Sequence, residues 1–129
     1  MKRKLNASFT VEMSVIAPLA LFLIMGCILV IFYYHDRNIL SAAAYETAVV
    51  GGTKAREKEE ADAGELETLF RDRVRGKCIL LAQARAGVTV SEEAVRVDVT
   101  ASGAGMRMSL SRQAAVTDPE KEIRRIRRY

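Results

Sequence analysis

The residue in the most unusual chemical setting is Glu12, which stands directly before Met13–Tyr34, a run of 22 consecutive residues without a formal charge. A carboxylate at the edge of an apolar run is costly unless water or a cation reaches it. Glu12 therefore either extends its side chain to water in the lipid headgroup layer or forms a specific ion pair. The second interpretation would give the residue a function.

A cut between Ala7 and Ser8 would create the cation that this ion pair needs. It would remove a short basic leader and leave Ser8 with a free, positively charged amino group. Ser8 and Glu12 are four residues apart, so they share one face of a helix, one turn from each other. Pairing with the amine of a neighbouring chain would fix the axial register of the two chains, because the carboxylate is satisfied at one offset only.

The other reactive side chains do not form a recognisable catalytic or metal site. His35 is the only histidine and directly follows the apolar run, where an interfacial role is the ordinary one. Cys27 lies inside the run and Cys78 far beyond it, so a disulfide between them would have to form at membrane depth. Acidic pairs such as Glu59-Glu60 are typical of a solvated connector. We therefore expect no enzyme activity, no cofactor and no metal.

The apolar run is the element that must position Glu12. As a helix it would be about 33 Å long, close to the hydrocarbon thickness of a bilayer. We therefore expect one transmembrane helix in contact with lipid. Lys2, Arg3 and Lys4 precede it, which favours a cytoplasmic N-terminus and an extracytoplasmic C-terminal domain at the plasma membrane. This orientation also argues against nucleic acid as a partner of the basic C-terminal end.

The first helix is expected to continue beyond the apolar run. Helix-forming residues follow it and make one common face, with Ile39, Leu40, Ala43, Ala44 and Thr47. We expect the helix to begin near Ser8 and to end at about Val50, since Gly51-Gly52 is the first strong stop signal. Pro18 lies inside it and either kinks the helix or is tolerated there.

Two further patterns predict a small α+β domain after a charged connector. Apolar residues at three- and four-residue spacing predict an amphipathic helix from Gly64 to near Gly87, weakened at Gly76. Strict alternation around "ASGAG" then predicts an antiparallel hairpin, with Val95, Val97, Val99, Met106, Met108 and Leu110 on one face. The second helix would cover that face, and Gly87–Ser91 would add a short edge strand.

The expected fold class is α+β: one transmembrane helix that continues as a long pilin-like helix, a second amphipathic helix and a small antiparallel sheet. A short helix is expected to start at Asp118-Pro119 in the cationic tail. The expected parts are a basic leader (1–7), the long helix (8–50), a charged connector (51–63), the α+β domain (64–116) and the basic tail (117–129).

The segment "ASFTVEMSVIAPLALFL" resembles the N-terminus of type IV prepilins, and more narrowly of the TadE-like pseudopilins of tight-adherence (Tad/Flp) pilus systems. The resemblance covers about Lys4 to Val50. It implies a minor pseudopilin that a prepilin peptidase cuts and that joins other pilin subunits at a pilus assembly platform. On matching positions, Ala7 precedes the cut, Ser8 becomes the N-terminus and Glu12 is the assembly glutamate.

Three other fates of the N-terminus stay open. Ala7 stands where pilins usually have glycine, which leaves room for an uncleaved envelope anchor that binds a partner through its outer domain. "LIMGC" looks like a lipoprotein box ending at Cys27, although the chain stays apolar after it. "SAAAY" near Ser41 offers small residues for ordinary signal peptidase, but the apolar segment before it is too long for a signal peptide.

Overall fold

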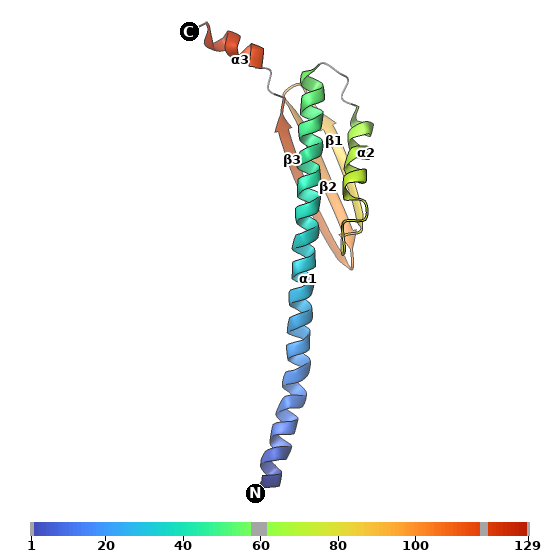
Figure 1. Cartoon of the computed structure of the whole chain (residues 1–129), viewed down its shortest axis with the longest axis vertical. Coiled ribbons are helices and arrows are strands. Elements are labelled where there is room, and N and C mark those ends of the chain that lie inside the picture. The colour runs from blue at the N-terminus through green and yellow to red at the C-terminus, as the bar shows by residue number, and fades with distance from the viewer. Residues whose placement is uncertain (1, 58–61, 117–118, 129) are drawn as a thin grey trace. The chain divides into compact units, whose positions relative to one another are not determined.

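The computed structural model describes residues 2–57, 62–116 and 119–128 of the chain. Their elements are α1 (Lys2–Arg56), α2 (Ala63–Val74), β1 (Gln83–Val90), β2 (Ala94–Gly103), β3 (Met106–Ala115) and α3 (Pro119–Ile126), in this order (Figure 1). The predicted α+β class is confirmed. The chain divides into two compact units between Tyr34 and His35, and each is described by itself.

The first unit contains the N-terminal part of α1. The helix holds an 18-residue window of mean hydropathy 3.0, and none of that window is buried in the structure. Its length and composition fit a single-pass membrane protein. The expected helix start near Ser8 was wrong, because α1 begins at Lys2. Lys, Arg, Leu and Ala in the leader are good helix formers, and no residue there breaks the helix.

The expected helix end at Val50 was also wrong, because α1 runs through Gly51-Gly52 to Arg56. A Cβ added at Gly51 would lie 2.9 Å from Leu66 Cδ1 and 3.0 Å from Val95 Cγ1. The glycine therefore lets α1 approach α2 and β2 closely. Packing of the second unit outweighs the helix penalty of a glycine, which is about 1 kcal/mol.

Helix α2 is much shorter than the sequence predicts. Asp62 accepts a hydrogen bond from the Gly64 N–H (3.0 Å) at its N-terminus. The helix ends at Val74, and Gly76 adopts a left-handed conformation with φ +71° just after it. This is the ordinary way in which glycine terminates a helix. The predicted end near Gly87 was therefore wrong, and the residues from 75 to 82 form the connection to β1.

The three strands form one antiparallel sheet in the order β1-β2-β3. The predicted hairpin is confirmed: Gly103 pairs with Met106, and Ala104 and Gly105 form the turn with φ values of 50° and 76°. Two positive φ values identify a type I′ turn, which matches the twist of a two-residue hairpin. An edge strand is present where a short one was expected at Gly87–Ser91, but it is longer. It is β1, which pairs with β2 along its whole length.

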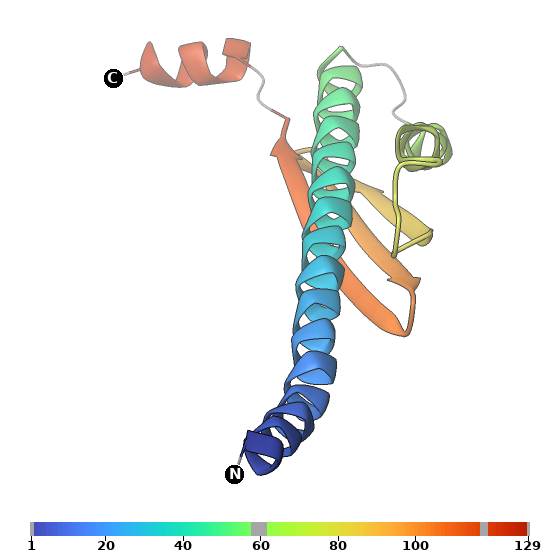
Figure 2. The ribbon, with the colours of Figure 1, turned by 60° about the horizontal axis from the view of Figure 1, so that its bottom comes forward.

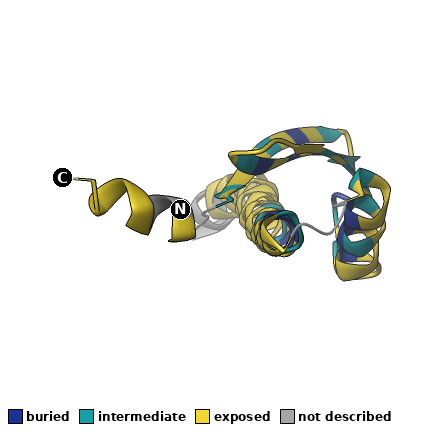
Figure 3. Ribbon diagram, turned by 90° about the horizontal axis from the view of Figure 1, so that it is seen from above, coloured by how far each residue is buried: buried dark blue, intermediate teal, exposed yellow. Residues whose placement is uncertain are grey.

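The core of the second unit lies between the inner face of the sheet and two helices. Figure 3 shows the part of α1 within this unit and α2 on the same side of the sheet, and Figure 2 shows the strands behind α1. Helix α2 packs against β1, whereas the sequence predicted that it would cover the face of the β2–β3 hairpin. The face of α1 predicted from the sequence is buried at Leu40, Ala43, Ala44 and Thr47, and Ile39 at its edge is half-buried. The buried apolar residues are Leu40, Ala43, Ala44, Ala48, Leu66, Phe70, Val74, Leu81, Val95, Val97, Val99, Ala101 and Met108.

Helix α3 begins at Pro119, in agreement with the predicted short helix in the tail. Asp118, the other residue of that prediction, lies outside the described residues. Ile123 and Ile126 are exposed, and an ion pair joins Arg124 to Glu120 at 4.0 Å.

Candidate functional site

The predicted processing and assembly residues all lie on α1. Ala7, Ser8 and Glu12 are exposed, and Ser8 and Glu12 are one helical turn apart. Among the described residues, no side-chain hydrogen bond or ion pair involves the Glu12 carboxylate. In the intact chain the Ser8 nitrogen is an uncharged peptide nitrogen. A cut before Ser8 would supply a cationic amine one turn from Glu12, and the amine of a second chain would supply one as well.

Pro18 lies inside the continuous helix α1. Its ring nitrogen carries no hydrogen, so the Ser14 carbonyl loses its helical donor. The Ser14 hydroxyl donates to the Val11 carbonyl at 2.7 Å, one turn earlier. The helix is not interrupted at this point, and a role for Pro18 in bending it stays a prediction.

A second site, which the sequence analysis did not identify, is centred on Asp36 in the second unit. Its side chain is completely buried. Ile79 donates its N–H to both carboxylate oxygens at 2.9 and 3.0 Å. The N–H groups of Leu80 and Leu81 donate to Oδ2 at 2.6 and 2.8 Å. We call this arrangement of Asp36 with three successive N–H groups the Asp36 clamp.

The hydrogen bonds of the clamp keep Asp36 ionised. Burial raises the pKa of its carboxyl group, because water stabilises the charge better than apolar surroundings do. The N–H groups of Ile79 and Leu81, the His35 ring and the N–H of Leu80 together outweigh that effect and hold the pKa below 3.8. His35 contributes through Nδ1, which lies 3.1 Å from Oδ1. Asp36 lies beyond the uncharged run, so this environment belongs to the folded domain.

The clamp fixes the connection between α2 and β1. On one side the backbone of the connection is hydrogen-bonded to Asp36, and on the other side it contacts Gly103 at the end of β2. A Cβ at Gly103 would overlap the backbone carbonyl of Leu80. The clamp and the glycine therefore hold the same segment from two sides, which sets the start of β1 relative to α1 and β2.

The sequence contained a signal for the clamp. Asp36 is four residues before Leu40, and the buried face continues through Ala43, Ala44 and Thr47. An aspartate on the apolar face of a helix needs a hydrogen-bonding partner inside the domain. Asp36 was not among the candidate residues predicted from the sequence.

Cys78 lies next to the clamp, in the connection between α2 and β1, and is partly buried. Burial raises the pKa of its thiol, and the negative charge of Asp36 raises it further. Both effects keep the thiol protonated, so it is a poor nucleophile. Cys78 therefore behaves as a structural residue of the second unit.

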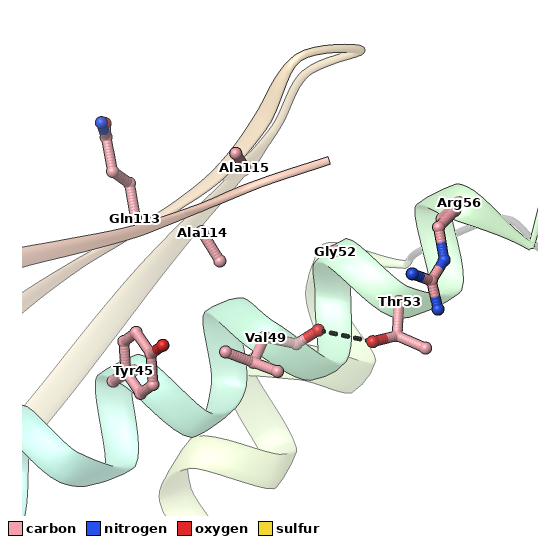
Figure 4. Close-up of a pocket in the computed structure, with 8 residues that line it drawn as sticks. All are labelled: Tyr45, Val49, Gly52, Thr53, Arg56, Gln113, Ala114 and Ala115. Carbon is pink, nitrogen blue, oxygen red and sulfur yellow. Dashed lines mark hydrogen bonds between the residues drawn. The ribbon is translucent and has the colours of Figure 1, made fainter. Parts of the chain in front are cut away.

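A groove runs beside β3 on the side of α1. Two adjoining hollows of about 370 and 570 Å³ share Tyr45 and Gln113 in their linings. Figure 4 shows Tyr45 and Val49 on α1 across from Gln113 and Ala114 on β3. Arg112 on β3 donates from Nε to Ser41 Oγ of α1 at 2.9 Å. Arg56 and Arg112 are the charged residues among the described lining residues, so the groove is positively charged.

Residues 7–49 match the family model described as TadE-like protein. The match includes Ala7, Ser8, Glu12 and Pro18, and it confirms the resemblance predicted from the N-terminal motif. It covers most of α1 and none of α2 or the sheet. No curated protein and no solved structure matches the chain.

Proposed function

We propose that this chain, which is TadE-like over residues 7–49, is a minor pseudopilin-like structural component of a Tad (Flp-type) pilus or a related secretion filament. The observation that carries the proposal is the family match, which spans Ser8, Glu12 and the uncharged run together. The exposed apolar helix supports it, because such a surface needs lipid or neighbouring helices around it. The proposed role is structural and not enzymatic.

In the proposed pathway the chain first inserts into the plasma membrane with its N-terminus in the cytoplasm. A prepilin peptidase then cuts between Ala7 and Ser8. The new Ser8 amine, of the same chain or of a neighbour, pairs with Glu12 in a setting where an unpaired carboxylate is costly. This pairing selects the axial position at which the chain joins other pilin subunits on the assembly platform.

The mature N-terminus is the first test of this proposal. We expect mass spectrometry of the chain, purified from membranes that contain the cognate prepilin peptidase, to find Ser8 as the first residue. Ala7→Gly should keep this product, whereas Ala7→Arg should leave the leader attached. An intact leader on the unmodified chain would support the uncleaved anchor instead. A chain that starts at Cys27 would support a lipoprotein.

The assembly role of Glu12 is tested separately. We expect Glu12→Ala and Glu12→Gln to insert normally but to reduce co-purification of other pilin-like subunits by about tenfold, which corresponds to about 1.4 kcal/mol. Ser14→Ala is the matched control, since it also removes an exposed polar side chain from α1. Undiminished co-purification with the Glu12 variants would refute the ion-pair hypothesis even if the leader is cleaved.

A further inference from the structure

The sheet has two open edges. No further strand pairs with β1 or β3 in the part of the chain that the structure describes. On β3 the closing pair of the hairpin involves Met106, so the odd-numbered residues from 107 to 115 direct their N–H and C=O groups outward. On β1, the Ser91 N–H donates to the Ala94 carbonyl, so the even-numbered residues from 84 to 90 point outward. Open edges of this kind are templates for another strand.

The two edges run in the same direction, because β1 and β3 are both antiparallel to β2. Identical chains that are inserted into one membrane with the same topology have their domains in the same orientation relative to the membrane. Two such copies side by side bring β1 of one against β3 of the next as parallel strands. Antiparallel pairing of β3 with β3 would instead relate two copies by a two-fold axis, and the contact would close at a dimer.

The register of the sheet suits this parallel pairing. The strand pairs place Ala84 of β1 at the level of Met108 of β3. If the two copies are not shifted along the strand direction, the outward-pointing N–H and C=O groups of Ala84 in one copy face those of Arg107 and Ser109 in the next. A parallel ladder has this pattern, in which one residue bonds to two residues on either side of its level.

The side chains at these levels are also compatible. On the inner face, Ala84 and Ala86 would lie opposite Met108 and Leu110, so small residues meet large ones. On the outer face, Arg85 would lie opposite Ser109 and Arg107 opposite Gln83. The arginines of the two edges therefore do not lie directly opposite each other, which is the arrangement in which like charges destabilise a strand pair.

The groove beside β3 adds charge complementarity. Its lining carries Arg56 and Arg112 and no carboxylate among the described residues. The copy that brings β1 to this edge also brings α2. On α2, Leu66 faces the core and Glu65 pairs with Lys54 of α1 at 2.7 Å, so Glu67 lies on the flank away from α1. That flank places a carboxylate toward the positive groove.

We propose that the β3 edge and its groove bind the β1 edge and the α2 flank of a second copy of this chain. The contact is heterologous, so it leaves one edge of each copy free for a further copy and extends beyond a dimer. It requires only that the copies have the same orientation in the membrane, and it does not depend on leader cleavage or on Glu12.

Disulfide cross-linking of the full chain in native membranes tests the proposal. In a background with Cys27→Ser and Cys78→Ala, Thr89→Cys is combined in turn with Ser109→Cys, Ser111→Cys and Gln113→Cys. We expect mild oxidation to give a ladder of trimers and higher multimers, most strongly with position 113, which is level with 89. Thr100→Cys with Gln113→Cys is the control, because Thr100 lies on the central strand, and it should stay monomeric.

The absence of a ladder at all three positions would overturn the proposal. Products that stop at the dimer would overturn it as well, since they indicate a closed contact.

A backbone variant supplies a second readout. Ser109→Pro removes one outward N–H and should abolish the ladder, whereas Ser109→Ala should preserve it. If Ser109→Pro unfolds the domain, a charge exchange takes its place as the second readout. Glu67→Arg alone and Arg112→Glu alone should each weaken the ladder, and the double variant should restore it. Failure of that restoration would also refute the proposed contact.

Discussion

Asp36→Ala is expected to lower the free energy of unfolding of the second unit by about 3–5 kcal/mol, the range for removing one partner of a buried, charge-assisted contact. The variant leaves the N–H groups of Ile79, Leu80 and Leu81 without their acceptor. Urea unfolding of the full chain in detergent, followed by circular dichroism, measures the change. The membrane helix stays folded in the micelle, so the transition reports the second unit.

The matched control is Glu46→Ala, which removes another carboxylate from α1. Glu46 is exposed and pairs with Arg73 at 3.4 Å, so its loss should cost about 0.2–1 kcal/mol. Equal losses in the two variants would mean that the Asp36 clamp does not hold the connection to β1.

Acid should weaken the clamp in the unmodified chain. The pKa of Asp36 is lowered by folding, so its contribution to stability is complete above the ordinary value of 3.8. It is lost as the pH falls through the lower value of the folded state. Stability measured from about pH 6 to about pH 3 should therefore fall less steeply in Asp36→Asn than in the unmodified chain. Parallel curves would contradict an ionised clamp.

Patterns that are local in the sequence predicted their elements well. The alternation of Val95, Val97 and Val99 with polar residues identified strand β2 and its buried face. The face of α1 around Leu40 and Ala44 was equally clear, because it rests on the periodicity of a single helix. The N-terminal motif around Glu12 led to the family that the comparison then found over residues 7–49.

The errors arose where a residue's role depends on a distant partner. Gly51 has the local character of a helix stop, but Leu66 and Val95 pack against it and the helix continues. The apolar residues Cys78 and Leu81 fit a helical period, yet Asp36 captures the backbone at Ile79–Leu81 in a non-helical conformation. Neither contact can be read from neighbours in the sequence, because the partners are separated by more than ten residues.

Gly103→Ala is expected to cost about 3 kcal/mol, at the upper end of the range for overpacking. The added Cβ would meet the backbone carbonyl of Leu80, which cannot rotate away as a flexible side chain can. Either the end of β2 or the connection held by Asp36 must move. Gly87→Ala is the control: it lies in a strand with open space around its Cβ position and should be neutral or slightly stabilising.

A double variant shows whether the clamp and the glycine hold the same segment. Once Asp36→Asn has loosened the connection, the Leu80 carbonyl can retreat from a new side chain at Gly103. The loss of stability in the double variant should then be smaller than the sum of the two single losses, by a coupling energy of about 0.5–3 kcal/mol. Strict additivity would mean that Asp36 and Gly103 act on independent parts of the domain. A coupling of the expected sign would show that one short segment connects α1 to the end of the sheet.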